Sequence, residues 1–213
     1  MKDKYPKHEI YEELYKRYFK RDVQELIDLA EVSKNDKVLD ICGGNGRLTK
    51  KLAEITRDVS YLDQEPDMTP KDLADLGVTV YNTPVQDFIE KTKLKYDKVF
   101  CQQAVNYWLL DIDIELFSEI FAKGGLFIFN TFANKPTEKP MFKQYEIDGV
   151  SYLEISYLVD NKVHHVQIRE GYEPHYTVFD WIDEDTVRNL LEPYFNIEIV
   201  RDGSTLIYKC RKR

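Results

Sequence analysis

Apolar and polar positions follow two different periods along this chain, which predicts alternating helices and strands. Between residues 9 and 30 the apolar side chains recur at helical spacing, with lysines and glutamates between them. An unbroken apolar run at residues 37–42 predicts a buried strand, residues 47–55 return to the helical period, and residues 59–62 predict a second strand. The chain therefore begins as helix, strand, helix, strand.

The same alternation continues to residue 130. We expect helices at residues 71–76 and 114–121, a turn or helix at 86–91, and strands at 78–81, 98–101 and 126–129, the last after a turn at Gly124-Gly125. Repeated strand–helix units form parallel strands joined by right-handed crossovers, and ligands bind such sheets at the carboxyl ends of the strands. The pattern predicts an α/β fold.

Residues 131–180 break this pattern. Alternating runs at 150–159 and 163–168, separated by Asp160-Asn161-Lys162, predict an antiparallel hairpin. Afterwards Asp183 can cap a helix that continues to Leu191, and residues 197–200 and 205–208 predict a final strand pair. We therefore expect an antiparallel insertion between the parallel strands and the last helix.

Length and charge limit the classes of function. The 213 residues suit one domain with an ordinary core, and the formal net charge of −8 argues against a protein that holds nucleic acid by general attraction. Basic clusters at residues 16–21 and 209–213 are then solvated surface. No run is apolar and long enough to cross a bilayer, and three scattered cysteines suit the reducing cytoplasm, so we expect a cytoplasmic protein without a membrane partner.

A glycine loop follows the first strand, and it is the strongest indication of a ligand site. In Asp40-Ile41-Cys42-Gly43-Gly44-Asn45-Gly46, Gly44 and Gly46 lack the Cβ atoms that would hinder a sharp bend and a close ligand, and the helix that follows offers free N–H groups. The carboxylate of Asp40 would repel a pyrophosphate, but it suits a cationic ligand or one rich in hydroxyl and amino groups.

This loop resembles the first motif of class I S-adenosylmethionine-dependent methyltransferases, with Cys42 in place of the first glycine and Gly43 at the variable position. The resemblance covers residues 35–132 and resumes at 181–210. It implies a Rossmann-like three-layer sandwich with a mostly parallel seven-stranded sheet, a final antiparallel strand and an inserted antiparallel β lid. One domain, 1–213, then comprises a helical cap (1–34), a cofactor-binding core (35–132), the lid (133–180) and a C-terminal helix with its strand pair (181–213).

The resemblance also implies which residues contact the cofactor, S-adenosylmethionine. Asp63, at the end of the second strand, would accept hydrogen bonds from the ribose hydroxyls; the alternative is that it only caps the next turn. Pro84 stands where the family often has an acidic residue that contacts adenine, so adenine would be held by the backbone near Val85 and Gln86, or by Asp87, whose alternative role is a helix cap. The full cofactor set is Asp40, Cys42, Gly43, Gly44, Gly46, Asp63, Gln64, Met68, Val85, Gln86, Asp87 and Gln102.

The acceptor side is expected beyond the fourth strand and on the lid. Asn106 and Tyr107 follow Gln102 towards the acceptor, while Trp108 suits the core, and no Asn-Pro-Pro-Tyr motif of amino-methyltransferases acting on DNA or on protein glutamine is present. Strand alternation allows only one of His164 and His165 to face inward, and we favour His165 as a proton acceptor, with a surface histidine as the alternative. Tyr18 is a second catalytic candidate, and Arg169 and Tyr172 complete the acceptor contacts.

The insertion and an N-terminal aromatic helix carrying Tyr11, Tyr15 and Tyr18 resemble the coverings of methyltransferases that act on glycine, sarcosine or amino sugars. This resemblance implies methyl transfer to a nitrogen or oxygen of a small, enclosed acceptor, with S-adenosylhomocysteine as product. No spacing matches a metal site. The alternatives are a nicotinamide-dependent oxidoreductase, for which Thr49 stands in place of the third glycine, a methyltransferase acting on protein, and a binding module without chemistry. The residues do not define an oligomeric state.

Overall fold

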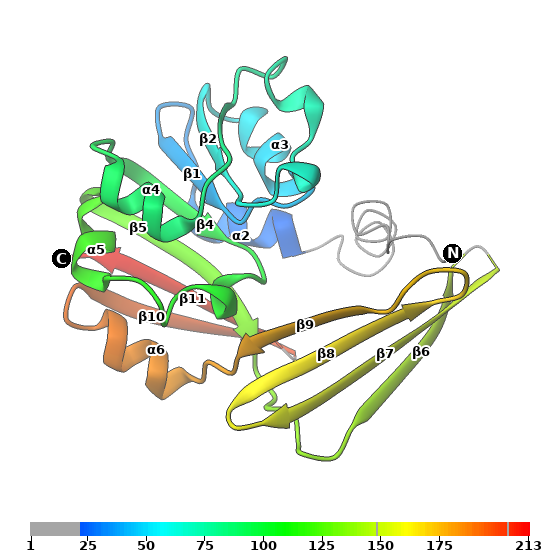
Figure 1. The fold of residues 1–213 in the computed structure, drawn as a ribbon. Coiled ribbons are helices and arrows are strands. Elements are labelled where there is room, and N and C mark those ends of the chain that lie inside the picture. The colour runs from blue at the N-terminus through cyan, green and yellow to red at the C-terminus, as the bar shows by residue number, and fades with distance from the viewer. Residues whose placement is uncertain (1–21, 148, 204) are drawn as a thin grey trace.

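The structure is a computed structural model that describes residues 22–147, 149–203 and 205–213 (Figure 1). Its strands are β1 (Lys37–Ile41), β2 (Asp58–Leu62), β3 (Thr79–Tyr81), β4 (Tyr96–Cys101), β5 (Phe121–Phe132), β6 (Met141–Ile147), β7 (Val150–Val159), β8 (Lys162–Arg169), β9 (His175–Asp180), β10 (Phe195–Asp202) and β11 (Thr205–Lys212). Its α-helices are α2 (Asp22–Ala30), α3 (Arg47–Ala53), α4 (Val85–Lys91), α5 (Ile114–Glu119) and α6 (Glu184–Leu191). Short 3₁₀ turns are η1 (Pro66–Met68), η2 (Lys71–Leu73) and η3 (Val105–Tyr107).

The larger sheet has seven strands in the order β10-β11-β5-β4-β1-β2-β3. Each pair from β5 to β3 is parallel, whereas β11 runs antiparallel to both of its neighbours. This confirms the predicted mostly parallel sheet with an antiparallel final strand. The carboxyl ends of β1, β2 and β4 lie side by side, because Asp40 pairs with both Tyr61 and Phe100.

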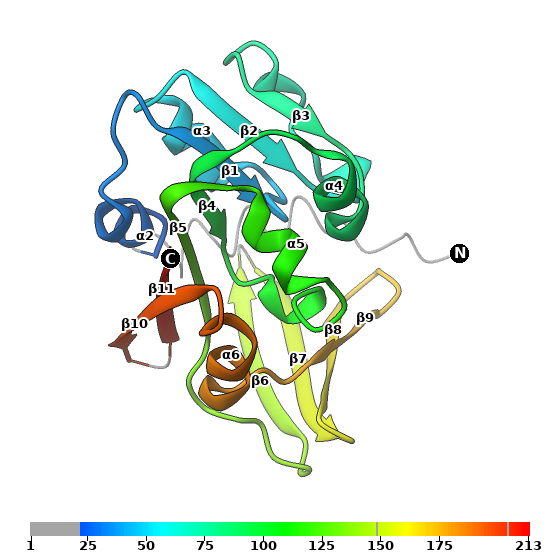
Figure 2. The same cartoon turned by 90° about the vertical axis from the view of Figure 1, so that its left-hand side faces the viewer.

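Helices cover both faces of this sheet and complete the three layers (Figures 1 and 2). On one face Leu26 of α2 and Leu52 of α3 pack on Val38 and neighbouring strand residues. On the other face α4, α5 and α6 pack on a cluster of aromatic rings, in which Phe117 meets Phe127 edge to face at 5.0 Å. The sheet is therefore buried on both sides, as its near-continuous apolar strands require.

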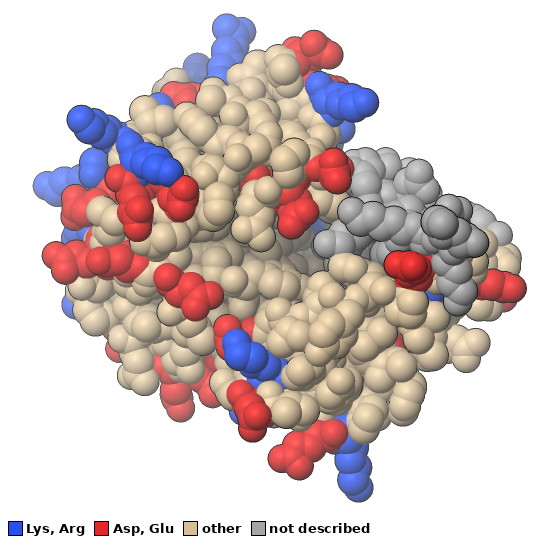
Figure 3. All heavy atoms as spheres, in the orientation of Figure 1, with Lys and Arg blue, Asp and Glu red and all other residues tan. Residues whose placement is uncertain are grey.

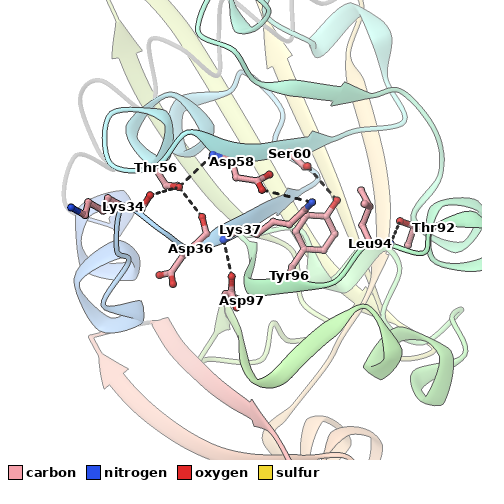
Figure 4. Close-up of polar contacts among 10 residues, drawn as sticks. All are labelled: Lys34, Asp36, Lys37, Thr56, Asp58, Ser60, Thr92, Leu94, Tyr96 and Asp97. Atoms are coloured by element: carbon pink, nitrogen blue, oxygen red, sulfur yellow. Dashed lines mark hydrogen bonds and ion pairs between the residues drawn. The ribbon is translucent and has the colours of Figure 1, made fainter.

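Polar contacts fix the amino ends of the strands, at the edge opposite the glycine loop (Figure 4). The Lys37 amide donates to Asp97 at 2.8 Å, and the Thr56 hydroxyl donates to the Asp36 carbonyl at 2.7 Å. The Tyr96 hydroxyl donates to Ser60 at 3.2 Å, deep in the sheet, where burial raises the pKa of Tyr96 to about 12. These groups all have protein partners, which suits a structural role.

Three predicted elements differ from the structure. Gly124-Gly125 is not a turn before the strand but an irregularity inside β5, where the pairing with β4 shifts between Tyr96 and Lys98. A Cβ on Gly125 would lie 2.9 Å from the Tyr96 carbonyl oxygen, so the bulge needs glycine at this position. The helix expected at 71–76 is only the turn η2, and the helix expected at 114–121 ends at Glu119, because β5 already begins at Phe121.

The insertion forms a second, antiparallel sheet in the order β6-β7-β8-β9, which we call the lid sheet (Figure 1). Its central hairpin was predicted, and it turns through Asp160 and Asn161, both with positive φ (50° and 61°). Strands β6 and β9 were not predicted. The β7–β8 turn is hydrogen-bonded to the segment between β9 and α6: the Trp181 amide donates to the Asn161 carbonyl at 2.9 Å, and Asn161 Nδ2 donates to the Trp181 carbonyl at 3.2 Å.

Parts of two expectations lie outside the described residues. Of the helix expected at 9–30 the structure describes α2, while Tyr11, Tyr15, Tyr18 and the basic cluster at 16–21 fall in the undescribed part.

Among the described helices none has both the length and the apolar character that spanning a membrane requires. On the face shown in Figure 3, acidic and basic side chains are interspersed.

Candidate functional site

The glycine loop connects the carboxyl end of β1 to α3 through several left-handed residues. Cys42, Gly44 and Gly46 have φ values of 55°, 52° and 70°, so Cys42 adopts a conformation that favours glycine. Gly46 is the first residue before α3, and its amide donates to the Gly43 carbonyl at 2.9 Å. The Cys42 thiol lies against Cys101 at the end of β4, and this contact together with burial raises the pKa of Cys42 well above its usual value.

Gly43 is the most sterically restricted residue of the loop. A Cβ at this position would lie 2.4 Å from Cε2 of Tyr61 and 3.2 Å from a carboxylate oxygen of Asp40. The Tyr61 hydroxyl donates to the Gly44 carbonyl at 2.7 Å, so the ring of Tyr61 supports the loop from β2. The sequence pattern assigned Gly43 to a variable position and did not indicate Tyr61 as a residue of the site. Their contact depends on the pairing of β1 with β2, which the local sequence does not show.

Asp40 lies beneath the loop in the protein interior. Its side chain is 1% exposed, and its Oδ2 accepts a hydrogen bond from the Thr49 hydroxyl at 2.5 Å. Burial raises the pKa of Asp40 to about 7, against the opposing effect of the Thr49 hydrogen bond, and the nearby Asp63 carboxylate raises it further. The structure therefore gives this carboxyl group a protein partner that the sequence did not indicate.

Asp63 joins the end of β2 to the glycine loop. Its Oδ2 accepts from the Gly44 amide at 2.9 Å, and its Oδ1 accepts from the Glu65 amide at 2.8 Å. Asp63 therefore caps the turn after β2, as the alternative interpretation expected, and it also contacts the glycine loop. Gln64 is exposed, and Met68 is half-buried in η1 on the segment that follows.

Helix α4 begins directly after Pro84 and presents its first turn to the same edge of the sheet. Val85 is buried, and the Gln86 carboxamide donates to Glu90 while its buried Oε1 has no hydrogen-bond partner among the described residues. Asp87 forms an ion pair with Lys91 at 2.7 Å, and no side chain caps this helix. The alternative role of Asp87 as a helix cap is therefore wrong, because its carboxylate pairs along the exposed side of the helix.

Residues after β4 extend the site away from the loop. Gln102 accepts from Arg47 Nη2 at 3.4 Å, and its Nε2 is buried without a partner in the described parts of the chain. Gln103 has a φ of 54°, and its amide donates to the Asn130 side chain at 2.8 Å. Trp108 packs against Phe117 in the core, which agrees with the expected role.

Asn106 and Tyr107 connect this edge to the lid sheet. Asn106 is 5% exposed, and its Nδ2 donates to the Asp180 carbonyl at 2.9 Å. The Tyr107 ring lies 5.2 Å from that of Phe179 in β9. Burial raises the pKa of Tyr107, a hydrogen bond with Thr177 opposes this shift, and the nearby Cys42 thiol adds to it. Tyr107 therefore lies between the glycine loop and the lid, a position that depends on Thr177 and Phe179, which the sequence did not single out.

His165 lies on the face of the lid sheet that also carries Thr177 and Phe179. It pairs directly with Thr177, and its Nδ1 is 2.8 Å from the Ser156 hydroxyl. Burial is the main cause that lowers the pKa of His165, which favours the neutral imidazole at pH 7. His164 points to the opposite face, where its ring stacks on Tyr157 at 5.0 Å and hydrogen-bonds to Tyr176.

Arg169 and Tyr172 are not close to Asn106 and Tyr107. Phe179, which contacts Tyr107, pairs with Val163, and Arg169 follows Val163 by six residues along β8. At about 3.3 Å per residue this separation is about 20 Å. The structure therefore divides the expected acceptor residues between the two ends of the lid sheet.

A small polar hollow lies next to Asn106, at the carboxyl end of β5. Its lining is mostly amide and hydroxyl side chains: Gln103, Asn106, Asn130, Thr131, Phe132 and Thr205. Within residues 22–213, apart from 148 and 204, no three His, Cys, Asp or Glu side chains are grouped to hold a metal ion.

The chain was compared with known proteins. No protein-family model and no curated protein matches it. Several solved structures match over nearly the whole chain. DesVI of Streptomyces venezuelae is 15% identical, with a TM-score of 0.73 over 99% of this chain and 100% of DesVI.

Two further matches are similar in extent. An S-adenosylmethionine-dependent methyltransferase from Clostridium acetobutylicum ATCC 824 is 16% identical, with a TM-score of 0.70 over 96% of this chain and 98% of its own. CalS10, an amino pentose methyltransferase from Micromonospora echinaspora solved with S-adenosylmethionine bound, is 15% identical, with a TM-score of 0.71 over 95% of this chain and 97% of its own. The chain therefore has the fold of the class I S-adenosylmethionine-dependent methyltransferases.

Proposed function

We propose that this protein is an S-adenosylmethionine-dependent methyltransferase that transfers a methyl group to a nitrogen or oxygen of a small-molecule acceptor. The observation that carries the proposal is the joined unit of glycine loop and Asp63 at the carboxyl edge of β1, β2 and β4. Ligands of open α/β sheets bind at this edge. The structural matches to methyltransferases, one of them with the cofactor bound, support the same function.

The site residues fit this cofactor in two respects. Gly44 has little around the place where a Cβ would stand: among the described residues beyond its chain neighbours, the nearest atom is the Cys42 carbonyl oxygen at 3.9 Å, so the backbone can approach a ligand closely. The buried Gln86 Oε1 and Gln102 Nε2 have no partner among the described residues, and a buried polar atom without a partner costs free energy. A nucleoside with an amino acid tail offers donors and acceptors that can pair with both atoms.

Asp63 would hold the ribose hydroxyls, and the first turn of α4 with Gln86 would hold the base. When bound, S-adenosylmethionine supplies an electrophilic methyl group. Tyr107 and Phe179 would exclude water between the loop and the lid, and alignment of two reactants in such an enclosed site lowers a barrier by several kcal/mol. When Nδ1–H of His165 donates to Ser156, Nε2 keeps its lone pair and can accept a proton from the acceptor.

The lid sheet supports a polar acceptor. Its inward face, defined by Phe179 and Thr177, carries polar side chains, namely Glu154, Ser156, His165 and Gln167. Its outward face is more apolar, with Leu153, Ile155, Val166 and Ile168. The amino pentose acceptor named for CalS10 is polar as well.

Unpaired cysteines at 42, 101 and 210 suit the cytoplasm, which we propose as the compartment.

Calorimetric titration with S-adenosylhomocysteine and with NADH tests the cofactor. We expect saturable binding of the first and none of the second, and Asp63→Ala should weaken binding by about 100-fold, since a hydrogen bond to a charged group contributes ~1.5–3 kcal/mol. Asp58→Ala is the matched control, because Asp58 lies at the opposite end of β2 with its side chain 60% exposed. Binding of NADH alone would contradict the proposal.

Methyl transfer from labelled S-adenosylmethionine to metabolite or protein fractions of a cell extract tests the acceptor class. Label in the small-molecule fraction is the expected result. Label in protein alone would favour a methyltransferase that acts on protein. Cofactor binding without any transfer would favour a binding module without chemistry. Once an acceptor is known, His165→Gln should lower kcat and shift its pH profile, whereas an unchanged profile would remove His165 from proton transfer.

A further inference from the structure

Arg169 ends β8 on the inward face of the lid sheet. Register places it directly opposite Tyr152, and His165 and Gln167 precede it on the same face. The Tyr172 amide donates to the Arg169 carbonyl at 3.2 Å, so the turn after β8 brings Tyr172 back beside Arg169. This end of the sheet therefore gathers an arginine and several tyrosines.

Aromatic rings hold the Arg169 guanidinium in place. Its central carbon lies 4.5 Å from the centroid of the Tyr172 ring and 5.6 Å from that of Tyr152. Tyr152 in turn stacks on Tyr145, with centroids 5.3 Å apart and planes inclined by 3°. Contact with ring faces restrains the guanidinium plane but uses none of its N–H donors, which lie in that plane.

The described residues provide no acidic partner for Arg169. No carboxylate among them lies within ion-pair distance, and Nε is buried without a hydrogen-bond partner. The neighbouring Glu154 accepts instead from Tyr145 at 2.9 Å and from Gln167 at 3.2 Å. Arg188, by contrast, pairs with both Glu184 and Glu192. In a chain with 38 acidic and 30 basic residues, an unpaired and restrained arginine is a specific feature of this site.

We propose that Arg169, held between Tyr152 and Tyr172, binds an anionic group, a phosphate ester or a carboxylate, at the far end of the acceptor. A guanidinium fork with free donors matches the paired oxygens of either group. The assignment of this anion to the acceptor rests on the proposed methyl transfer, whereas anion binding itself does not. Glu154 does not compete for the fork, because its carboxylate is held by two neighbours.

The spacing determines the shape of such an acceptor. Arg169 follows His165 by four residues on β8, which is about 13 Å along the strand. Gln167 lies between them, 4% exposed, and its buried Oε1 has no partner among the described residues, so it can accept a hydrogen bond from a hydroxyl or amino group of the same molecule. The acceptor would then be extended, with its anionic end well separated from the methylated atom, whereas the resemblance of the sequence implied a small, enclosed acceptor.

Nitrogen-15 NMR of the arginine Nε–H groups tests the site directly. The Arg169 signal is identified by its loss in Arg169→Met, and the protein is titrated with inorganic phosphate, pyrophosphate or succinate at constant ionic strength set with NaCl. We expect a saturable shift of this signal. A response to the phosphates alone assigns a phosphate ester, and a response to succinate assigns a carboxylate.

Affinity measured by calorimetry with the more effective anion completes the test. Arg169→Met should raise its dissociation constant at least tenfold, and Arg169→Lys, which keeps the charge and the stem, several-fold. Arg57→Met is the control, because Arg57 is exposed before β2, and it should change the constant less than twofold. No saturable shift, or unchanged affinity in both Arg169 variants, would overturn the proposal.

Binding of S-adenosylhomocysteine to the same variants separates this inference from the proposed function. It should be unchanged in Arg169→Lys, because Arg169 lies about 20 Å along β8 from the position opposite Phe179. Anion binding without any affinity for S-adenosylhomocysteine would refute the methyltransferase and leave the anion site in place. Affinity for S-adenosylhomocysteine without any anion binding would refute only the anion site.

Discussion

At the scale of single residues, the site depends on side chains of the sheet that contact the glycine loop and fix its conformation. Asp40 and Tyr61 lie within the sheet, and Asp63 receives hydrogen bonds from both the loop and the turn after β2. The places of Asp63, directly after β2, and of Gly44, in the loop after β1, could be predicted, because both follow from the order of elements along the chain. The contacts of Gly43 with Tyr61 and of Asp40 with Thr49 could not, because they depend on strand register and helix placement.

The raised pKa of Asp40 predicts a pH-dependent effect of Asp40→Asn on stability. Because the folded pKa, about 7, exceeds the unfolded value of 3.8, the stabilising contribution of the neutral acid is complete below 3.8 and is lost as pH rises to about 7. Asp40→Asn should therefore gain stability relative to the natural protein between pH 5.5 and pH 8, by about 2 kcal/mol. Urea unfolding at the two pH values, with Asp58→Asn as control, measures the difference, and a pH-independent difference would refute it.

Substitution of Gly43 tests the contact with Tyr61. Gly43→Ala places a methyl group 2.4 Å from the ring and should lower the free energy of unfolding by at least the ~1–3 kcal/mol that overpacking costs. Gly77→Ala is the control: Gly77 has a φ of 75° but open space around its Cβ position, so only backbone strain of ~1–2 kcal/mol applies. Tyr61→Val should partly rescue Gly43→Ala in urea unfolding, and an additive double variant would show that the ring is not the cause.

At the scale of elements, the central hairpin of the lid was predictable and its outer strands were not. The hairpin combines strong alternation with Asp160-Asn161, a pair that tolerates positive φ. Strand β6 alternates weakly and is largely exposed, and β9 is short and follows Pro174, so neither has a clear local pattern. Both strands exist because their backbones pair with the hairpin, which is a tertiary effect.

Asn161 links the β7–β8 turn to the segments that follow β9 and β5, and two substitutions separate its contributions. Asn161→Ala removes the hydrogen bonds to Trp181 and from Lys135 and strains a φ of 61°, so we expect a loss of about 2 kcal/mol. Asn161→Gly loses the same hydrogen bonds without the strain and should be destabilised by about half as much. Chemical unfolding of both variants provides the comparison. Equal losses would show that the backbone conformation contributes nothing.

At the scale of the whole molecule, the two sheets differ in how their strands are protected. The strands β1, β4 and β5 are buried between helices, whereas among the described residues the lid sheet has few buried apolar side chains, namely Tyr152 and Val163. Stability within one protein varies with such burial, and poorly covered elements open at lower free energy. We therefore expect the lid sheet to open at a lower free energy than the larger sheet.

Amide hydrogen exchange measures this difference. Peptides from β7 and β8 should exchange faster than peptides from β1 and β4, and a saturating concentration of S-adenosylhomocysteine should slow exchange in the glycine loop. At 100 times its dissociation constant, the ligand should add about 2.7 kcal/mol to the free energy of unfolding and raise Tm by about 5–11 °C. Uniform exchange across both sheets would contradict a separately opening lid.

The Trp181–Asn161 pair also gives the protein a built-in optical probe. The chain has two tryptophans, both buried: Trp108 in the aromatic core and Trp181 at the junction of the lid. Since indole emission shifts to longer wavelength on contact with water, a Trp108→Phe protein would emit from the junction alone. Its fluorescence would then follow the docking of the lid in real time, without an attached dye, during binding of cofactor and acceptor.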